Sequence, residues 1–401
     1  GCWIEGSNRY RQPFLTKKGN CNMNFQLTKE QELLCKMIRS FAEKEITPIV
    51  SEIDKNEEFP MEAVKKLGKL GALGLPIPRE YGGAGADYVS YAILMEELAK
   101  AYSVFATIVG AQTSLATWPI LNFGTDEQKQ KYVTALAKGE KLGSFCLTEP
   151  NAGSDSAAQQ TKAEDKGMYW LLNGSKLFIT NGGVAEIFVV FAMTDKAKGN
   201  HGISAFIVEK GDPGFHVGKT EDKLGIRASS TTELIFQDCT IPKDRILGQP
   251  GEGFKIAMET LAGGRIGVAA QAVGIAQGAF DLTVQYMKQR KQFGKKLTQF
   301  QALAFEMAEM HTKIHAARLL VYEAAALKDA HKPHALASAM AKLMSAETAM
   351  QVAVKCVQFH GGYGFIKDYA IERYFRDAKI TEIYEGTSEI QKLIISGAVL
   401  K

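Results

Sequence analysis

The strongest constraint on the fold is a change of residue pattern in the middle of the 401-residue chain. Between about residues 143 and 250, short runs rich in Val, Ile and Phe alternate with clusters of Gly, Asn, Asp and Pro. The clearest runs span 187–193, 203–208 and 233–236. Such runs predict short antiparallel strands, and no long helical pattern interrupts them as a parallel doubly wound sheet would require. The block therefore predicts an antiparallel β-barrel or sandwich domain. Within it, Asn173-Gly174 between two apolar runs predicts a hairpin with a type I′ turn.

Helical patterns flank this block on both sides. Thr28 and Gln31 form a capping box before apolar residues at helical spacing, and 125–139 predicts an amphipathic helix. Residues 255–291 are apolar or small on nearly every face, which indicates a buried, closely packed helix. With helices predicted over 300–330 and 334–359, the C-terminal part is expected to form a four-helix bundle. The predicted fold class is α+β.

The pattern divides the chain into four segments. We predict a leader over 1–22, an N-terminal α-helical domain over 23–142, a β domain over 143–252 and a C-terminal helical bundle domain over 253–401. The leader begins with Gly1 and lacks an apolar period, so we expect it to be artificial. Its alternative is the remnant of a transit peptide, which its four basic residues favour and its scarce serines disfavour.

Composition excludes several classes of protein. The 48 basic and 44 acidic residues leave a net charge of +4 without a basic block, which disfavours nucleic acid as a partner. The six cysteines are scattered without a CxxC pair, as expected for a reducing compartment. No apolar run that would span a bilayer, which takes roughly 18 to 20 residues, is expected.

Three familiar motifs are incomplete. GFHVGKT (Gly214 to Thr220) is one residue short of a P-loop and is expected to close a β-turn. No GxGxxG follows a predicted strand, so nicotinamide binding in a Rossmann fold is not indicated. His311 and His315 are spaced as zinc ligands can be, but a third ligand is missing, and we predict no metal site.

Four loops carry residues suited to a flavin and a thioester. They are IYEGTSEIQ (Ile383 to Gln391), CLTEPNAGSD (Cys146 to Asp155), FITNGG (Phe178 to Gly183) and QFHGGYGF (Gln358 to Phe365). Glycine-rich turns offer backbone N–H groups to phosphates, and Glu385 offers a carboxylate base. Each loop also has an ordinary alternative, such as a glycine at a helix end or a core Phe. Together they indicate proton abstraction coupled to hydride transfer to a flavin.

With these four loops, the chain from about residue 25 to the C-terminus resembles the acyl-CoA dehydrogenase family. The resemblance is greatest to its short-chain (butyryl-CoA) dehydrogenases of bacterial type. The resemblance implies FAD-dependent α,β-dehydrogenation of a short-chain acyl-CoA thioester to the trans-2-enoyl-CoA. Glu385 would abstract the α-proton, the β-hydride would pass to flavin N5, and the electrons to an electron-transferring flavoprotein. It also implies a homotetramer built as a dimer of dimers. The expected location is cytoplasmic, as in bacteria, with the mitochondrial matrix as the alternative.

The resemblance further implies which residues form the site. Glu385 would be the catalytic base, and its backbone N–H and the FAD ribityl hydroxyl would bind the thioester oxygen. The residues implied to bind FAD are Phe145, Cys146, Leu147, Thr148, Gly153, Ser154, Phe178, Ile179, Thr180, Arg290, Phe293, Gln301, Gln358, Phe359, His360, Gly361, Gly362, Thr387, Ser388 and Glu389. Of these, Arg290, Gln301 and 358–362 would reach the FAD of a neighbouring subunit. The residues implied to bind the substrate are Ser154, Ala262, Gly263, Gly264, Arg265, Tyr384 and Gly386.

Some positions depart from the family pattern. Some relatives carry the base immediately before the arginine corresponding to Arg265, where this chain has Gly264, which leaves Glu385 as the candidate. Phe178 stands where several mitochondrial members carry Trp, and His360 replaces an apolar residue. Trp118 either shortens the acyl pocket or belongs to the core.

Several other functions stay open from the sequence. The enzyme could run in reverse as an enoyl-CoA reductase, or act on medium-chain, branched or aromatic acyl-CoA. An acyl-CoA oxidase is disfavoured because those chains are much longer. A non-catalytic helical interaction protein that has lost the flavin is the alternative outside enzymes.

Overall fold

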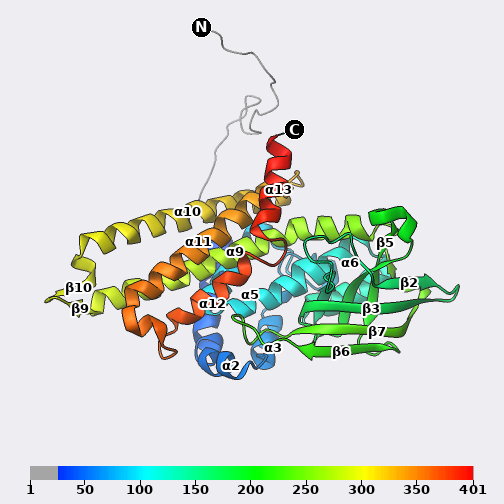
Figure 1. The fold of residues 1–401 in the computed structure, drawn as a ribbon, viewed down its shortest axis with the longest axis horizontal. Coiled ribbons are helices and arrows are strands. Elements are labelled where there is room, and N and C mark those ends of the chain that lie inside the picture. Colours follow the sequence, from blue (N-terminus) through cyan, green and yellow to red (C-terminus); the bar gives the residue numbers. More distant parts are fainter. Residues whose placement is uncertain (1–25, 401) are drawn as a thin grey trace, which may run out of the picture.

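The protein is described here by a computed structural model covering residues 26–400, so the predicted leader lies outside the described residues. Helices come first, a sheet follows, and a second set of helices completes the chain (Figure 1). The α+β class and the order of its three parts are therefore confirmed. The boundaries assigned to the domains stay a prediction.

The N-terminal part begins with the predicted capping box. The Thr28 hydroxyl accepts the Gln31 N–H at 3.2 Å, and the Gln31 side chain accepts the Thr28 N–H at 3.0 Å. The helix predicted at 125–139 begins with the same arrangement at Thr125 and contains a π-helical turn. The helices of this part are α1 (Lys29–Phe41), η1 (Ala42–Ile46), α2 (Val50–Asn56), α3 (Met61–Lys69), η2 (Ala72–Gly74), η3 (Arg79–Tyr81), α4 (Tyr88–Ala101), α5 (Ser103–Val109), η4 (Gly110–Thr117), α6 (Trp118–Phe123), α7 (Asp126–Gln128), η5 (Lys129–Val133) and α8 (Thr134–Ala137).

One helical stretch corrects the expectation about apolar runs. Ser103–Phe123 is long and apolar enough to cross a membrane by length and composition. However, 89% of its most apolar stretch is buried inside the protein, as in the core helix of a globular domain. Its apolar character is explained by packing, because it lies between the sheet and α9 (Gly253–Gln289).

The central part is a single eight-stranded sheet in the order β6-β7-β3-β2-β4-β5-β8, with β1 paired to β4. Most strand pairs are antiparallel, as predicted, but β1 and β2 both pair with β4 in parallel, so the sheet is mixed. Short 3-10 turns η6 (Lys196–Gly202) and η7 (Lys243–Arg245) connect strands. The strands are β1 (Gly143–Cys146), β2 (Lys162–Asp165), β3 (Tyr169–Thr180), β4 (Ile187–Met193), β5 (Ile203–Glu209), β6 (Phe215–Thr220), β7 (Thr231–Pro242) and β8 (Ile246–Leu247).

One local prediction in this part is wrong. The hairpin at Asn173-Gly174 does not form, because β3 runs straight through it and pairs with β7 on both sides of a bulge. Asn173 bridges the bulge, since its side chain accepts the Asp238 N–H at 2.8 Å and donates to the Asp238 carboxylate at 3.1 Å. GFHVGKT closes a turn at Gly214 (φ +81°), as predicted, and then continues as strand β6.

The C-terminal part contains the predicted long helices, and α9 runs through the middle of the molecule (Figure 1). Its glycines allow close contact with α4: a Cβ on Gly274 would lie 2.3 Å from the Glu96 carbonyl oxygen. The elements are α9 (Gly253–Gln289), β9 (Lys291–Gln292), β10 (Lys295–Lys296), η8 (Leu297–Gln299), α10 (Gln301–Asp329), α11 (Ala335–His360), η9 (Gly361–Phe365), α12 (Ile371–Thr381) and α13 (Ser388–Val399).

Replacing Gly274 with Ala is expected to destabilise the protein by about 1–3 kcal/mol, because the added methyl collides with backbone that cannot move aside. Thermal unfolding measures the effect as a lower melting temperature. Gly397→Ala is the matched control, since a Cβ there, on α13, meets no atom within 4 Å. Equal melting temperatures for the two variants would contradict the close packing of α9 on α4.

Candidate active site

The loop between α12 and α13 presents Glu385 in an unusual backbone conformation. Glu385 has φ +52° and Gly386 has φ +95°, so two successive residues are left-handed. Such conformations in non-glycine residues persist where the surrounding structure holds them, often at functional sites. The Oε2 atom of Glu385 is buried and has no hydrogen-bond partner among residues 26–400. It lies 2.3 Å from the position that a Cβ on Gly264 would occupy, so the carboxylate uses the space that this glycine leaves.

Three neighbouring elements hold this loop by its carbonyl groups. Lys342 on α11 donates from Nζ to the Gly386 oxygen at 2.7 Å, and Gln391 on α13 donates to the same oxygen at 2.8 Å. Arg265 on α9 donates from Nε to the Glu385 oxygen at 3.4 Å. The unusual backbone conformation is therefore supported from α9, α11 and α13 at once.

Arg265 and Lys342 also affect the pKa of Glu385. Burial raises the pKa of Glu385 to about 7, while the positive charges of Arg265 and Lys342 oppose that rise. Burial also lowers the pKa of Lys342 to about 8. A carboxylate with a pKa near neutrality is well placed to accept a proton at physiological pH.

Lys342 is a residue that the sequence analysis missed. It is fully buried and makes no ion pair with a carboxylate among the described residues. The signal was available, because Lys342 stands in a stretch of small and apolar residues (339–346), where a buried charge requires a partner. The residue pattern alone could not predict that the Lys342 amine donates to the Gly386 carbonyl.

Tyr384 fastens the start of the loop to α9 and α5. Its hydroxyl donates to the Gln271 side-chain oxygen. Gln271 in turn donates to the Ser103 hydroxyl at 2.7 Å and the Thr107 hydroxyl at 2.8 Å. Tyr384 was predicted as a substrate residue, and its hydroxyl is engaged in this buried network.

Of the predicted substrate residues on α9, Gly264 and Arg265 lie beside Glu385. At the adjacent Gly263, a Cβ would lie 2.1 Å from Lys328 Nζ, whose approach the sequence did not indicate. That amine lies 4.9 Å from the centre of the half-buried Trp118 ring. Ser154 is exposed in the loop after β1.

A buried ion pair supports the loop 145–154 in the β domain. Lys176 on β3 is fully buried and donates to the Glu149 carboxylate at 2.7 Å, the Leu147 oxygen at 3.1 Å and the Gln159 side chain at 3.1 Å. Glu149 also accepts the backbone N–H of Gln160 at 2.6 Å. The buried Lys176–Glu149 ion pair and its hydrogen bonds therefore hold the loop in position.

Phe178 projects from the sheet two residues beyond Lys176. Its side chain is 58% exposed and its φ is +59°, so it is not a core residue. The Leu177 N–H donates to the Thr148 oxygen at 2.9 Å, which joins the two predicted flavin loops. Cys146, Leu147 and Ile179 are buried, so these three predicted cofactor residues lie beneath the surface.

A second group of predicted cofactor residues forms one open pocket of about 540 Å³ at the end of α9 and α11. Arg290 and the stretch 358–362 both line it. A Cβ at Gly361 or Gly362 would meet no atom within 4 Å, so backbone here is open to a ligand. His360 is different: it is buried, bonds to the Cys356 oxygen at 2.8 Å and stacks on Tyr286.

The two groups lie far apart within one chain. In Figure 1, β3 is at one end of the molecule, while β9, β10 and the adjoining ends of the bundle helices are at the other. Phe293, which is 92% exposed, and Gln301 belong to the bundle end, whereas Thr387, Ser388 and Glu389 begin α13 near the middle.

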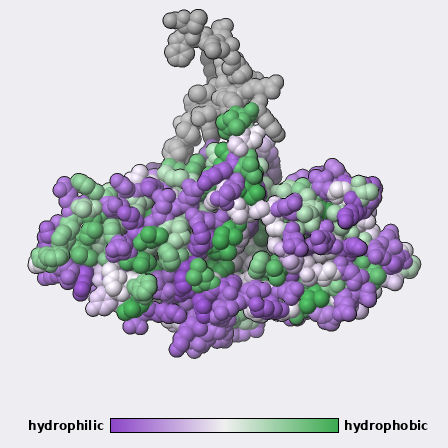
Figure 2. All heavy atoms as spheres, viewed as in Figure 1, coloured by the Kyte–Doolittle hydropathy of each residue, from purple (hydrophilic) through white to green (hydrophobic). Residues whose placement is uncertain are grey.

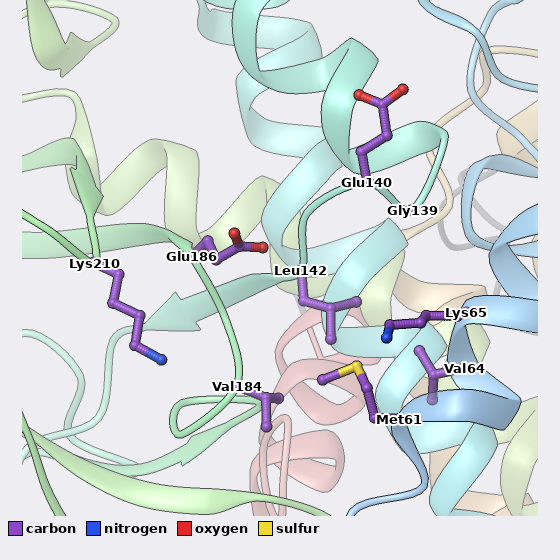
Figure 3. A pocket seen from close by; sticks show the side chains of 9 residues that line it. All are labelled: Met61, Val64, Lys65, Gly139, Glu140, Leu142, Val184, Glu186 and Lys210. Atoms are coloured by element: carbon purple, nitrogen blue, oxygen red, sulfur yellow. The ribbon is translucent and has the colours of Figure 1, made fainter.

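A separate hollow of about 420 Å³ lies where the N-terminal helices meet the β domain (Figure 3). Met61, Val64 and Leu142 contribute apolar side chains, and lysines and glutamates stand around them. No predicted site residue lines it. In the part of the chain that is described, no cluster of three or more His, Cys, Asp or Glu side chains suits a metal ion.

Comparison with protein families finds one family along the chain. The models described as "Acyl-CoA dehydrogenase, N-terminal domain", "middle domain" and "C-terminal domain" match residues 28–140, 144–239 and 251–400.

Individual relatives agree with this match. The chain is 59% identical to "Acyl-CoA dehydrogenase, short-chain specific" of Clostridium acetobutylicum, over 94% of this chain and 100% of that protein. It is 50% identical to "Acryloyl-CoA reductase (NADH)" of Anaerotignum propionicum, over 94% of this chain and 96% of that protein.

Solved structures match this chain over nearly its whole length. Butyryl-CoA dehydrogenase from Megasphaera elsdenii has a TM-score of 0.93 at 50% identity, covering 94% of this chain and 100% of that chain. A chain in a structure described as "Electron transferring flavoprotein of Acidaminococcus fermentans: Towards a mechanism of flavin-based electron bifurcation" has a TM-score of 0.94 at 54% identity, with the same coverage.

Proposed function

The chain belongs to the acyl-CoA dehydrogenase family, and from this premise we propose that it catalyses the α,β-dehydrogenation of a short-chain acyl-CoA thioester to the trans-2-enoyl-CoA. The observation that carries the proposal is that Glu385 Oε2 is buried next to Gly264 and has no hydrogen-bond partner among residues 26–400. The short-chain relatives in Clostridium and Megasphaera support the substrate class.

In this proposal Glu385 removes the α-proton. The α-proton of a thioester is weakly acidic, so a carboxylate can take it only where the negative charge that develops on the thioester oxygen is stabilised. The Glu385 N–H donates to no acceptor among residues 26–400 and is therefore available for that oxygen. The backbone conformation fixed by Lys342 and Arg265 determines where this N–H points. Burial by substrate would exclude water and keep the proton on Glu385 Oε2 after transfer.

Members of the family are flavoproteins, and we propose FAD as the cofactor. The residues present fit it: Phe178 offers an exposed aromatic face, and Gly361 and Gly362 offer an open backbone beside Arg290. FAD, when bound, supplies the acceptor for the hydride that leaves the β-carbon. Phe178 and the loop 145–154 would hold the flavin ring, and Arg290 with 358–362 would hold phosphate and adenosine groups.

The distance between these two groups supports a homotetramer in which Arg290 serves a neighbouring subunit's FAD. Large apolar side chains are exposed at the bundle end, as Phe293 and Phe365 are by 92% and 89%, and Figure 2 shows green residues on this side of the molecule. Exposed apolar surface of this kind favours an interface. We further propose an electron-transferring flavoprotein as the electron acceptor and a cytoplasmic location, with the mitochondrial matrix as the alternative.

The visible spectrum of the purified protein tests this function. Anaerobic addition of butyryl-CoA is expected to bleach the flavin band. A yellow protein that does not bleach would place the substrate elsewhere, among longer, branched or aromatic acyl groups. A protein that stays colourless with added FAD would overturn the proposal.

The reverse reaction is a second candidate, because a relative at 50% identity is an acryloyl-CoA reductase. The protein groups around Glu385 would serve either direction, with Glu385 returning a proton instead of taking it. Turnover of crotonyl-CoA with the reduced enzyme, compared with turnover of butyryl-CoA with the oxidised enzyme, separates the two.

Lys342→Met is expected to move the acid limb of the pH profile of kcat/KM to higher pH by about one unit or more. Glu385 acts only when ionised, so activity is present above its pKa of about 7 and is lost as pH falls through it. Removing the Lys342 cation raises that pKa further. Lys392→Met is the matched control, because Lys392 is exposed on α13 and pairs with Glu347. An unchanged profile in a folded, flavin-loaded Lys342→Met enzyme would contradict the role.

A further inference from the structure

The segment 221–230, which connects β6 to β7 and which we call the bridging loop, adjoins the predicted flavin loop 178–183. Lys223 closes the bridging loop from inside, because its Nζ donates to three of the loop's own carbonyl oxygens at 2.9, 3.3 and 3.4 Å. At the end of the loop, the Ser230 hydroxyl accepts the Gly183 N–H at 3.1 Å, and β7 then pairs with β3. The bridging loop is therefore joined directly to the flavin loop.

The bridging loop also contacts α12, the helix that leads to Glu385. A Cβ on Gly225 would lie 2.3 Å from the Arg376 carbonyl oxygen, so the two backbones are in close contact. The next residue, Ile226, donates its N–H to Asp377 Oδ1 at 2.6 Å, and both residues are buried. Ile226 has φ +44°, a conformation that a β-branched residue adopts only where its surroundings impose it. The Asp377 carboxylate is the acceptor that this conformation serves.

Only a short stretch of chain separates this contact from the base. Asp377 lies eight residues before Glu385. The Ile380 oxygen in the last turn of α12 accepts the Tyr384 N–H at 3.0 Å, so the chain turns back on the helix end directly before Glu385. A displacement of α12 at Asp377 would therefore also displace residues 382–387, which we call the base loop.

The N-terminal part of the chain holds the contact from a third side. The Asp54 carboxylate on α2 accepts hydrogen bonds from the Arg376 guanidinium at 2.7 Å and the Tyr102 hydroxyl at 2.8 Å. Arg227 of the bridging loop donates from Nε to the Asp54 backbone oxygen at 3.2 Å and forms an ion pair with Glu57. One network of ion pairs and hydrogen bonds therefore joins α2, the bridging loop and α12.

We propose that the contact between Asp377 and Ile226 positions the base loop relative to the flavin loop, so that Asp377 is a positioning residue for dehydrogenation. The inference rests on the proposed function, in which Glu385 takes a proton from one carbon while a hydride leaves the neighbouring carbon. The two acceptors belong to different parts of the chain and must be aligned with one substrate at once. A displacement of about 1 Å at such a site costs about 10²-fold in rate.

Two variants disturb the contact in different ways. Asp377→Leu removes the acceptor of the Ile226 N–H, and Gly225→Ala pushes the bridging loop away from the Arg376 oxygen. Anaerobic stopped-flow reduction of enzyme-bound FAD by butyryl-CoA gives a limiting rate and a half-saturating concentration. Each variant is expected to lower the limiting rate by about 10–100-fold and to change the half-saturating concentration by less than about threefold. Asp377→Asn keeps an acceptor oxygen and is expected to stay within about threefold of the wild-type rate.

Amide hydrogen exchange of the flavin-free protein is a second readout, which depends on neither substrate nor cofactor. In Asp377→Leu and Gly225→Ala, the amides of the base loop are expected to exchange about tenfold faster than in the wild type. In Asp377→Asn they are expected to exchange at close to the wild-type rate.

Gly74→Ala is the matched control. A Cβ there would also meet a backbone carbonyl, 2.5 Å from the Ala137 oxygen, but between η2 and α8, and Gly74 belongs to none of the predicted sites. It is expected to lower the melting temperature without changing the limiting rate or the exchange of the base loop. If the limiting rates of folded, FAD-loaded Asp377→Leu and Gly225→Ala are no lower than that of Gly74→Ala, the inference is overturned while reduction of the wild type stands. Failure of butyryl-CoA to reduce the wild-type flavin would overturn the proposed function instead, and hydrogen exchange would still test the contact.

Discussion

Glu385→Gln is expected to lower the rate of dehydrogenation by about 10³–10⁴-fold, because a neutral amide cannot accept the α-proton. The substitution keeps the size of the side chain, so the space beside Gly264 stays filled. The backbone contacts from Lys342, Gln391 and Arg265 are made to carbonyl groups of the loop and are unaffected. The protein should therefore fold, bind FAD and stay oxidised when butyryl-CoA is added anaerobically.

The control for this experiment is Glu62→Gln. Glu62 is an exposed carboxylate on α3 that pairs with Lys65 at 2.9 Å and belongs to none of the predicted sites. The Glu62→Gln variant should bleach with butyryl-CoA at close to the wild-type rate. Rapid bleaching of Glu385→Gln would assign proton abstraction to another group, whereas loss of bound flavin in that variant would point to a structural role.

Lys176→Met is expected to destabilise the protein by about 3–5 kcal/mol, because it leaves the Glu149 carboxylate buried without its counter-ion. Lys176 is fully buried, and its Nζ donates to Glu149, Leu147 and Gln159. Since Glu149 follows Thr148 directly, losing the pair should also loosen the predicted flavin loop. We expect a lower melting temperature and weaker retention of FAD.

Lys166→Met is the matched control in the same domain. Lys166 pairs with Glu164 at 2.7 Å, the same distance as the buried pair, but both side chains are exposed. Solvent screens such a pair and stabilises the carboxylate left behind, so the melting temperature should barely change. Equal effects of the two substitutions would mean that burial of the Lys176–Glu149 pair is not what stabilises the loop.

The local elements were predictable because their signals are local. The capping box at Thr28 and the apolar character of 255–291 depend on residues within a few turns of one another, and both predicted helices form. The same holds for strands β4 and β5. Where a signal was local but a distant partner competed with it, prediction failed: Asn173-Gly174 favours a turn, yet pairing along β7 extends β3 through it.

The sequence by itself determined the family, the order of helices and strands, and Glu385 as the candidate base, since order and motif spacing are properties of the chain. Only the tertiary structure decided what surrounds that base. Lys342 and Gln271 lie far away from it along the chain, and no periodic pattern specifies which buried side chain meets which loop. It also decided that the β sheet and the β9–β10 end of the helical bundle lie on opposite sides of the molecule (Figure 1). Packing of distant segments, governed by side-chain volume and the pairing of buried charges, settles such contacts.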